Sequence, residues 1–104
     1  MRRIEFTPKA RHDIEDIWDY SLERFGFDRA ETYLREIQRA AETVAEDPRR
    51  GVVCDSIRSG YRKFSVGSHV LFYRVPDERI VIVRILHQRM DFERHLPATT
   101  PRRS

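Results

Sequence analysis

The stretch Gly60–Val75, GYRKFSVGSHVLFYRV, decides the fold. Its two halves, Tyr61–Val66 and His69–Val75, are rich in the β-branched and aromatic side chains that favour strands. Gly67 and Ser68 between them suit a two-residue turn, because glycine tolerates the backbone angles that tight hairpins need. The stretch therefore predicts a β-hairpin at the centre of a sheet.

Two amphipathic helices, over residues 8–25 and about 28–46, are expected before the hairpin. In both segments apolar residues recur every three or four positions, which gives each helix one apolar stripe. Thr7 is predicted to cap the first helix, and Gly26 to end it in a tight turn. Asp28 is predicted to start the second helix through a capping box. So short a connection makes the pair an αα-hairpin.

The ends of the chain complete the outline. Arg3–Phe6 is a short strand candidate, and the β-branched run Ile80–Leu86 predicts a last strand before a helical turn. The element order is then β-α-α-β-β-β, an α+β fold with an αα-hairpin packed on one face of a mainly antiparallel sheet. Residues 1–96 are expected to form a single domain, and residues 97–104 a disordered C-terminal tail.

Alternation along the strands divides the predicted sheet into two faces. Val81, Val83 and Ile85 are wholly apolar, and we assign them to the face under the helices. The other face is expected to carry apolar side chains interleaved with cations: Tyr61, Lys63, Ser65, Val70, Phe72, Arg74, Ile80, Ile82 and Arg84. A solvated face would be more uniformly polar, so this face is predicted to meet a protein partner. Cover by the C-terminal segment or by a second copy remains an alternative.

Charge is unevenly divided along the 104 residues. The formal net charge is +3, but residues 1–47 hold 8 Lys/Arg against 12 Asp/Glu, whereas residues 48–104 hold 12 against 5. The basic half indicates an anionic partner, either nucleic acid or an acidic protein segment. A single cysteine excludes intrachain disulfides and Cys-cluster metal sites, and the four histidines lack metal-ligand spacing, so no metal or cofactor is expected. No apolar run suggests a signal peptide or a membrane span, so a cytoplasmic location is expected.

Three motifs together resemble a known family. They are Asp16–Tyr20 (DIWDY), the hairpin stretch quoted above, and Ile85–Asp91 (ILHQRMD). In this order they resemble the ParE toxins of the RelE/ParE toxin–antitoxin superfamily, over about residues 3–96. The resemblance implies the fold predicted above and a toxin held inactive by a ParD-type antitoxin. It also implies DNA gyrase as the target, whereas the sister RelE branch cleaves messenger RNA on the ribosome.

The residues that RNA-cleaving relatives use are largely missing here. Alignment of the strand motifs places Val70 and Met90 where those relatives carry arginine, and Leu96 near their C-terminal tyrosine; only Lys63 persists. Metal-free cleavage of RNA needs a base, an acid and a cation for the phosphorane. The resemblance therefore implies a non-enzymatic toxin. His87 is the alternative acid or base, and Cys54 lies in a predicted loop with no motif that would make it a nucleophile.

The family resemblance and the predicted exposure assign interface residues to two partners. Contact with the antitoxin is expected from the sheet-face residues Tyr61, Arg62, Lys63, Phe72, Arg74 and Arg84. Contact with gyrase is expected from the C-terminal residues Arg89, Met90, Phe92, Arg94 and His95. Two other functions remain open, a RelE-type ribosome-dependent mRNA endonuclease and a basic nucleic-acid-binding module. Acidic helices would be repelled by a nucleic-acid backbone, so direct sequence-specific binding is not expected.

Overall fold

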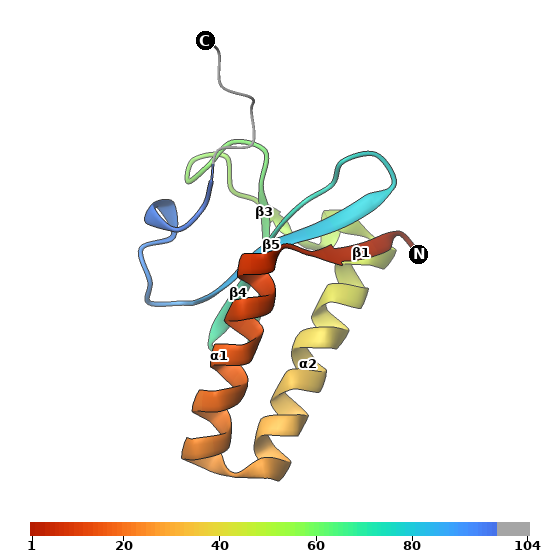
Figure 1. Ribbon diagram of the computed structural model, residues 1–104. Helices are drawn as coiled ribbons and strands as arrows, with labels where there is room; N and C mark the ends of the chain where they lie inside the picture. Colours follow the sequence, from red (N-terminus) through yellow and green to blue (C-terminus); the bar gives the residue numbers. More distant parts are fainter. Residues whose placement is uncertain (98–104) are drawn as a thin grey trace.

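A helical hairpin and a five-stranded sheet form the two layers of the computed structural model, which describes residues 1–97 (Figure 1). The sheet order is β1-β5-β4-β3-β2, with β1 parallel to β5 and the other pairs antiparallel. The α+β class and the αα-hairpin are therefore confirmed. The elements are β1 (Arg3–Phe6), α1 (Pro8–Phe25), α2 (Phe27–Glu46), η1 (Pro48–Arg50), β2 (Val52–Val53), β3 (Arg62–Val66), β4 (His69–Arg74), β5 (Arg79–His87) and η2 (Phe92–Arg94).

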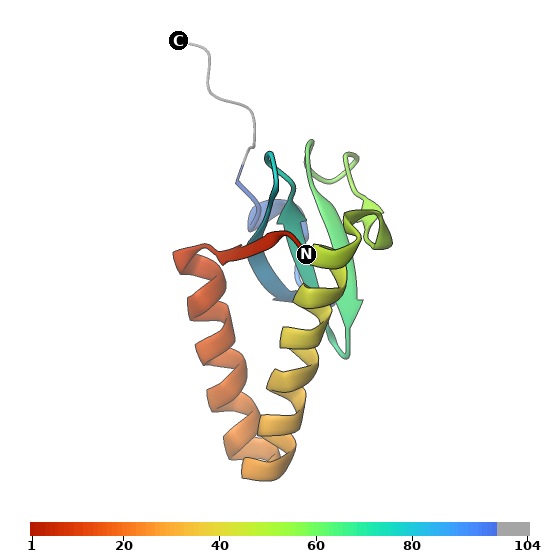
Figure 2. The same ribbon diagram turned by 90° about the vertical axis from the view of Figure 1, so that its right-hand side faces the viewer.

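Both helices lie on one side of the sheet, and the turn that joins them projects past the end of the strands (Figure 2). Thr7 caps α1 as predicted, because its hydroxyl accepts a hydrogen bond from the Ala10 N–H at 3.1 Å. Gly26, at φ +89°, ends α1 and also precedes the first residue of α2. The predicted capping box at Asp28 is wrong, since α2 begins at Phe27 and has no side-chain cap.

A β-bulge in β5 reverses the expected faces of that strand's first half. The register pairs Phe72 with Arg84, but the next residue of β4 pairs with Ile82, so Val83 is an extra residue. Because side chains alternate, one extra residue moves everything before it to the opposite face. Val81 and Val83 consequently face away from the helices, and Ile82 joins the core under them, contrary to the prediction.

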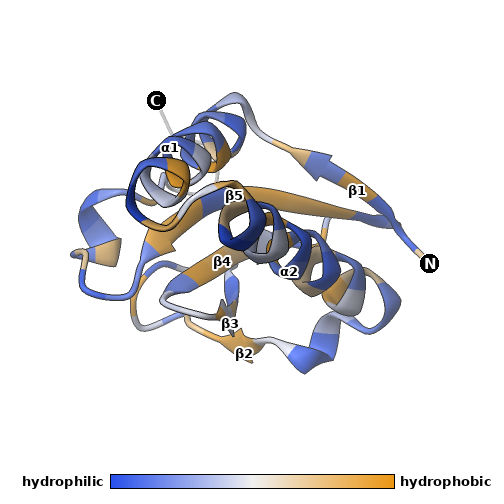
Figure 3. Ribbon diagram, turned by 90° about the horizontal axis from the view of Figure 1, so that it is seen from below, coloured by the Kyte–Doolittle hydropathy of each residue, from blue (hydrophilic) through white to orange (hydrophobic). Residues whose placement is uncertain are grey.

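The strands β4 and β5 are buried on both faces of the sheet. Between helices and sheet, the core includes Ile17, Ile37, Leu71, Tyr73 and Ile82. In Figure 3 the strands β4 and β5 are mostly hydrophobic, whereas the helices combine hydrophilic and hydrophobic residues. A second core lies on the other face: Cys54, Tyr61, Val70, Phe72, Val81, Val83, Leu86 and Leu96, with Ile57 and Phe92 packed against it. Residues 54–57 and residues 92–96 therefore cover this face of the sheet, as the helices cover the other face.

The region between α2 and the hairpin is more structured than predicted. Residues 49–60, expected to be a loop, include part of η1 and the two-residue edge strand β2. The tail predicted over residues 97–104 lies outside the described residues except for Pro97. Within the described range, neither helix is apolar enough to cross a bilayer.

Candidate interaction site

The sheet face predicted to meet the antitoxin is covered by the protein itself. Tyr61 is 1% exposed, Phe72 is fully buried, and the Arg84 side chain is 14% exposed. The covering residues belong to the C-terminal segment, residues 92–97, together with Cys54 and Ile57. The expectation of an open face is therefore wrong, and the alternative that the C-terminal segment covers it holds.

The C-terminal segment is fixed by both ring packing and hydrogen bonds. The Phe92 ring packs edge-on against Phe72 with centroids 4.8 Å apart. The Arg58 guanidinium donates to the carbonyl oxygens of Glu93 at 2.6 Å and Leu96 at 3.0 Å, and the Tyr61 hydroxyl donates to Pro97 O at 2.8 Å. Residues 54–61 and residues 92–97 thus hold each other over the second core.

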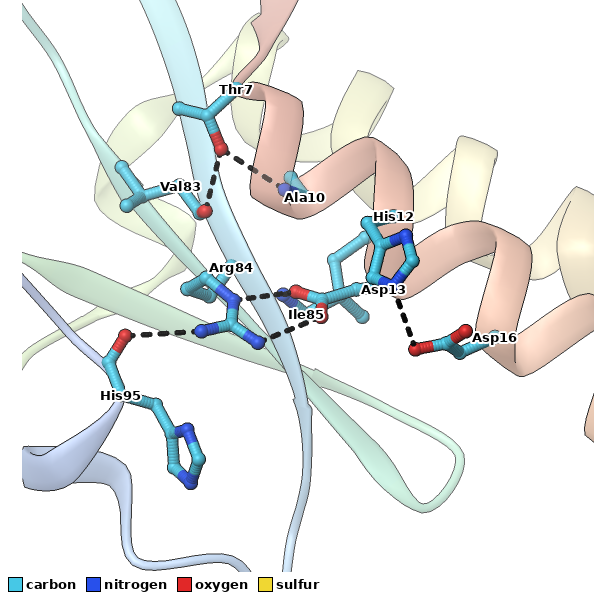
Figure 4. A network of polar contacts seen from close by, with 9 residues as sticks. All are labelled: Thr7, Ala10, His12, Asp13, Asp16, Val83, Arg84, Ile85 and His95. Carbon is cyan, nitrogen blue, oxygen red and sulfur yellow. Dashed lines mark hydrogen bonds and ion pairs between the residues drawn. The ribbon is translucent and has the colours of Figure 1, made fainter.

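An ion pair ties α1 to the bulge of β5 (Figure 4). The Arg84 guanidinium donates from Nε and Nη2 to the two Asp13 carboxylate oxygens, both at 2.8 Å, and Asp13 also accepts the Ile85 N–H at 2.9 Å. The hydrogen bond to Asp13 raises the pKa of Arg84. A third nitrogen of Arg84 donates to His95 O at 3.3 Å. Arg84 is therefore a structural link between α1, β5 and the C-terminal segment.

The other predicted antitoxin cations stay at the surface but on two faces. Lys63 pairs with Phe72 and Arg74 with Val81, so both lie at the margin of the face that the C-terminal segment covers. Arg62 pairs with Tyr73, whose side chain belongs to the core under the helices. Arg62 also donates from Nη1 to Gly51 O at 2.8 Å. Of the predicted set, Lys63 and Arg74 form a shared, half-buried margin of this face.

The residues predicted to engage gyrase are partly exposed. Arg89 and Arg94 are open to solvent and Met90 is 38% exposed. Phe92 is half-buried against Phe72, and the carbonyl of His95 accepts from Arg84. The exposed part of the set is thus Arg89, Met90 and Arg94, carried on a backbone that the second core holds in place.

A groove between the helices and the β3–β4 turn brings two histidines together. The His69 and His87 rings are 5.4 Å apart, and the Tyr33 hydroxyl lies 2.7 Å from His69 Nδ1. Tyr33 also accepts the Ser68 N–H at 3.1 Å. Burial, and then the neighbouring His87, lower the pKa of His69. Single-residue patterns do not reveal this pairing, because the histidines are neighbours only through the register of β4 and β5.

The lowered pKa of His69 gives a pH dependence of stability. The unfolded chain binds a proton at about pH 6.5 whereas folded His69 binds it only at lower pH, so stability is expected to fall as pH drops below about 6.5 and to level off below the folded pKa. Urea unfolding at about pH 7.5 and about pH 5.5 measures this loss. The loss should shrink in His69→Asn and persist in the exposed-site control His12→Asn. An unchanged loss in His69→Asn would refute the assignment to His69.

Cys54 and His87 are two potentially reactive side chains among the described residues. Among residues 1–97 no cluster of three or more His, Cys, Asp or Glu has metal-site geometry. Cys54 is buried, and burial raises the pKa of its thiol, which disfavours the thiolate needed by a nucleophile. The His87 Nδ1 accepts the Arg89 N–H at 3.1 Å, so only Nε2 of this ring is left for other hydrogen bonds.

An αα-hairpin on this mixed sheet defines the class of RelE/ParE-fold proteins. A solved chain of the chromosomal ParDE toxin–antitoxin system of P. aeruginosa superposes with a TM-score of 0.74 at 22% identity, covering 84% of this chain and 96% of that one. A chain of the RelBE2 toxin–antitoxin complex of Mycobacterium tuberculosis gives 0.61 at 24% identity, covering 83% and 96%. At these identities the likeness establishes the fold alone.

Sequence comparison gives the family. The model for the ParE toxin of the type II toxin–antitoxin system parDE matches residues 4–92. Toxin ParE1 of Mycobacterium tuberculosis is 53% identical over 95 residues, covering 90% of this chain and 97% of the relative. Toxin ParE1 of Caulobacter vibrioides is 43% identical over 96 residues, covering 92% and 99%. The chain belongs to the ParE toxin family of type II toxin–antitoxin systems, as the sequence motifs predicted.

Proposed function

We propose that the free protein inhibits DNA gyrase by binding it, and that a ParD-type antitoxin neutralises it by forming a complex with it. The observation that carries the proposal is the family match over residues 4–92, which spans both helices and all of the five strands except Arg3, the first residue of β1. A supercoiling assay with purified gyrase tests it. Three features of the structure support a binding role. They are the uncharged residues Val70 and Met90 at the catalytic positions of RNA-cleaving relatives, the C-terminal surface formed by Arg89, Met90 and Arg94, and the cationic margin formed by Lys63 and Arg74.

The positions that would need catalytic cations support a non-enzymatic toxin. Val70 is 6% exposed and lies in the second core, where a charged side chain would be costly to bury. Met90 is on the surface but carries no charge. One cationic donor of this kind is worth about 3 kcal/mol of transition-state stabilisation, so losing two removes most of it. The alternative mRNA endonuclease is tested by ribosome-dependent cleavage with the purified toxin, and cleavage that His87→Ala abolishes would overturn the proposal.

The C-terminal surface supports a protein target. Arg89, Met90 and Arg94 are exposed on the segment that follows β5. Arginine and methionine are enriched in protein interfaces, and arginine is frequent among the residues that dominate binding energy. Because Phe92 and Leu96 are packed in the second core, the backbone beside these side chains needs little further ordering on binding. We assign gyrase contact to these three residues, with Phe92 and His95 as support beneath them.

The cationic margin supports an acidic antitoxin segment. Lys63 and Arg74 lie beside apolar residues at the edge of the second core, in the basic half of the chain. Carboxylates of a folding antitoxin tail would meet these cations as they approach, and such complementarity mainly raises association rates. The buried residues Tyr61, Phe72 and Arg84 do not contact the antitoxin directly but support the fold beneath this margin.

Charge reversal at the margin is expected to slow antitoxin binding. Lys63→Glu with Arg74→Glu should lower the association rate constant about tenfold at low salt, and by less as salt screens the charges. Stopped-flow mixing with the acidic antitoxin segment at two ionic strengths measures the effect. Lys9→Glu with Arg39→Glu, exposed on the helices, is the matched control with the same change in net charge. Equal slowing in both double variants would show that net charge, not this margin, steers binding.

A further inference from the structure

The Arg58 side chain joins the loop between β2 and β3 to the C-terminal segment, residues 92–97. Its guanidinium donates from Nη2 to Glu93 O at 2.6 Å and from Nε to Leu96 O at 3.0 Å. Among the described residues, no other side chain outside the segment donates more than one hydrogen bond to its carbonyl oxygens. Arg58 therefore makes more polar contacts to this segment than any other described side chain.

The two carbonyls that Arg58 binds are left over by the helical turn η2. The internal hydrogen bonds of η2 use the carbonyl oxygens of Asp91 and Phe92. No backbone N–H of the described residues donates to Glu93 O or Leu96 O. Carbonyls at the end of a helix lack an intrahelical donor, and a cationic side chain can supply one. Because both Arg58 donors belong to one planar group, they fix the two carbonyls relative to each other as well as to the loop.

The loop that carries Arg58 has hydrogen bonds of its own. The Arg58 N–H donates to Cys54 O, and the Cys54 N–H donates to Tyr61 O, both at 3.0 Å. The Gly60 N–H donates to the Asp55 carboxylate at 3.0 Å. The side chains of Cys54 and Tyr61 are buried in the second core. The guanidinium therefore extends from a backbone that is already held, which lowers the cost of ordering it on the segment.

Arg94 of the C-terminal surface lies between the two carbonyls that Arg58 binds. Phe92 and Leu96 pack in the second core on either side of it, but the side chains of Glu93 and Arg94 themselves are exposed. Apolar packing thus fixes the segment at its two ends, and the Arg58 hydrogen bonds fix the backbone between them. The direction in which Arg94 leaves the backbone consequently depends on Arg58.

We propose that Arg58 is a positioning residue for target binding, which fixes residues 93–96 in the conformation that presents Arg94. Arg58 is half-buried and uses Nε and Nη2 on the segment, so it acts through Arg94 and not by touching the target. That the target is gyrase rests on the function proposed above, whereas the fixing of residues 93–96 does not.

The order of the segment tests the positioning directly. Backbone order parameters from nitrogen-15 relaxation of the full chain should be near the rigid value of about 0.85 at Arg94 and His95, and should fall toward about 0.6 in Arg58→Gln. Arg58→Lys keeps the charge but has one nitrogen for two carbonyls, so it should give a smaller fall at the same residues. Arg39→Gln, exposed on α2, is the control and should change nothing. Unchanged order at Arg94 and His95 in Arg58→Gln, or an equal fall in β4, would overturn the proposal.

Inhibition of gyrase tests whether Arg58 acts through Arg94. Arg58→Gln alone should raise the concentration for half-inhibition of supercoiling about tenfold. In the Arg94→Ala background the same replacement should have little further effect, because the side chain that Arg58 positions is gone. A general structural role would instead weaken inhibition in both backgrounds. A tenfold effect in both would therefore overturn the positioning role.

The two measurements separate this inference from the proposed function. A wild-type protein that leaves gyrase untouched refutes the proposed function, and the order parameters then still decide whether Arg58 fixes residues 93–96. Inhibition by the wild type that Arg58→Gln leaves unchanged refutes this inference alone.

Discussion

Replacing Asp13 with alanine is expected to lower the free energy of unfolding by about 3–5 kcal/mol, which is the usual cost of removing one partner from a buried ion pair. The Asp13 carboxylate accepts from Nε and Nη2 of Arg84 and from the Ile85 N–H. Alanine leaves the arginine charge without its counter-ion in a position where the side chain is 14% exposed. Alanine also removes the side-chain acceptor of the Ile85 N–H, two residues after the bulge. Urea unfolding followed by circular dichroism measures the loss.

Asp19→Ala is the matched control for this experiment. Asp19 is exposed on the same helix, so its replacement should change stability by no more than about 0.5 kcal/mol. A double variant, Asp13→Leu with Arg84→Met, should recover part of the loss, since apolar residues can replace a buried ion pair at little net cost but cannot accept the Ile85 N–H. A loss below about 1 kcal/mol in Asp13→Ala would show that the link between α1 and β5 contributes little to stability.

Local sequence signals were sufficient to predict most of the fold. The Thr7 cap, the Gly26 turn and the Gly67-Ser68 hairpin each depend on a few adjacent residues, and the structure has all three. The family resemblance, which rested on motifs distributed over the chain, is confirmed by the match over residues 4–92. Such features are readable because each residue's environment is set by its neighbours in the sequence.

The sequence was less informative where distant residues decide the outcome. The alternation of side chains along a strand could not reveal the bulge at Val83. The prediction therefore assigned the residues in the first half of β5 to the wrong faces of the sheet. The buried role of Asp13 could not be predicted, because its partner Arg84 is 71 positions away in the sequence. The cover over Phe72 depends on Phe92 and Leu96 folding back over the sheet. These are tertiary contacts, which cannot be inferred from the spacing of apolar residues or from composition.

Removing two arginines from the C-terminal surface is expected to abolish most gyrase inhibition. Arg89→Ala with Arg94→Ala should raise the concentration for half-inhibition of supercoiling by about 30-fold or more, because the loss of even one interface hot spot of about 2 kcal/mol corresponds to about 30-fold. Both side chains are exposed, so the fold and antitoxin binding should be preserved. The matched control Arg11→Ala with Arg39→Ala removes two exposed arginines from the helices instead. If the two double variants inhibit equally, the gyrase-binding surface lies elsewhere.

Supercoiling by purified gyrase in the presence of the antitoxin-free protein is the most direct test of the proposed function. We expect the protein to inhibit supercoiling, to leave cleaved DNA in covalent complex with gyrase, and to lose both effects when the ParD-type antitoxin is added first. Full supercoiling activity and no cleaved complexes, at a protein concentration that still binds the antitoxin, would contradict the proposal that this ParE family member acts on gyrase.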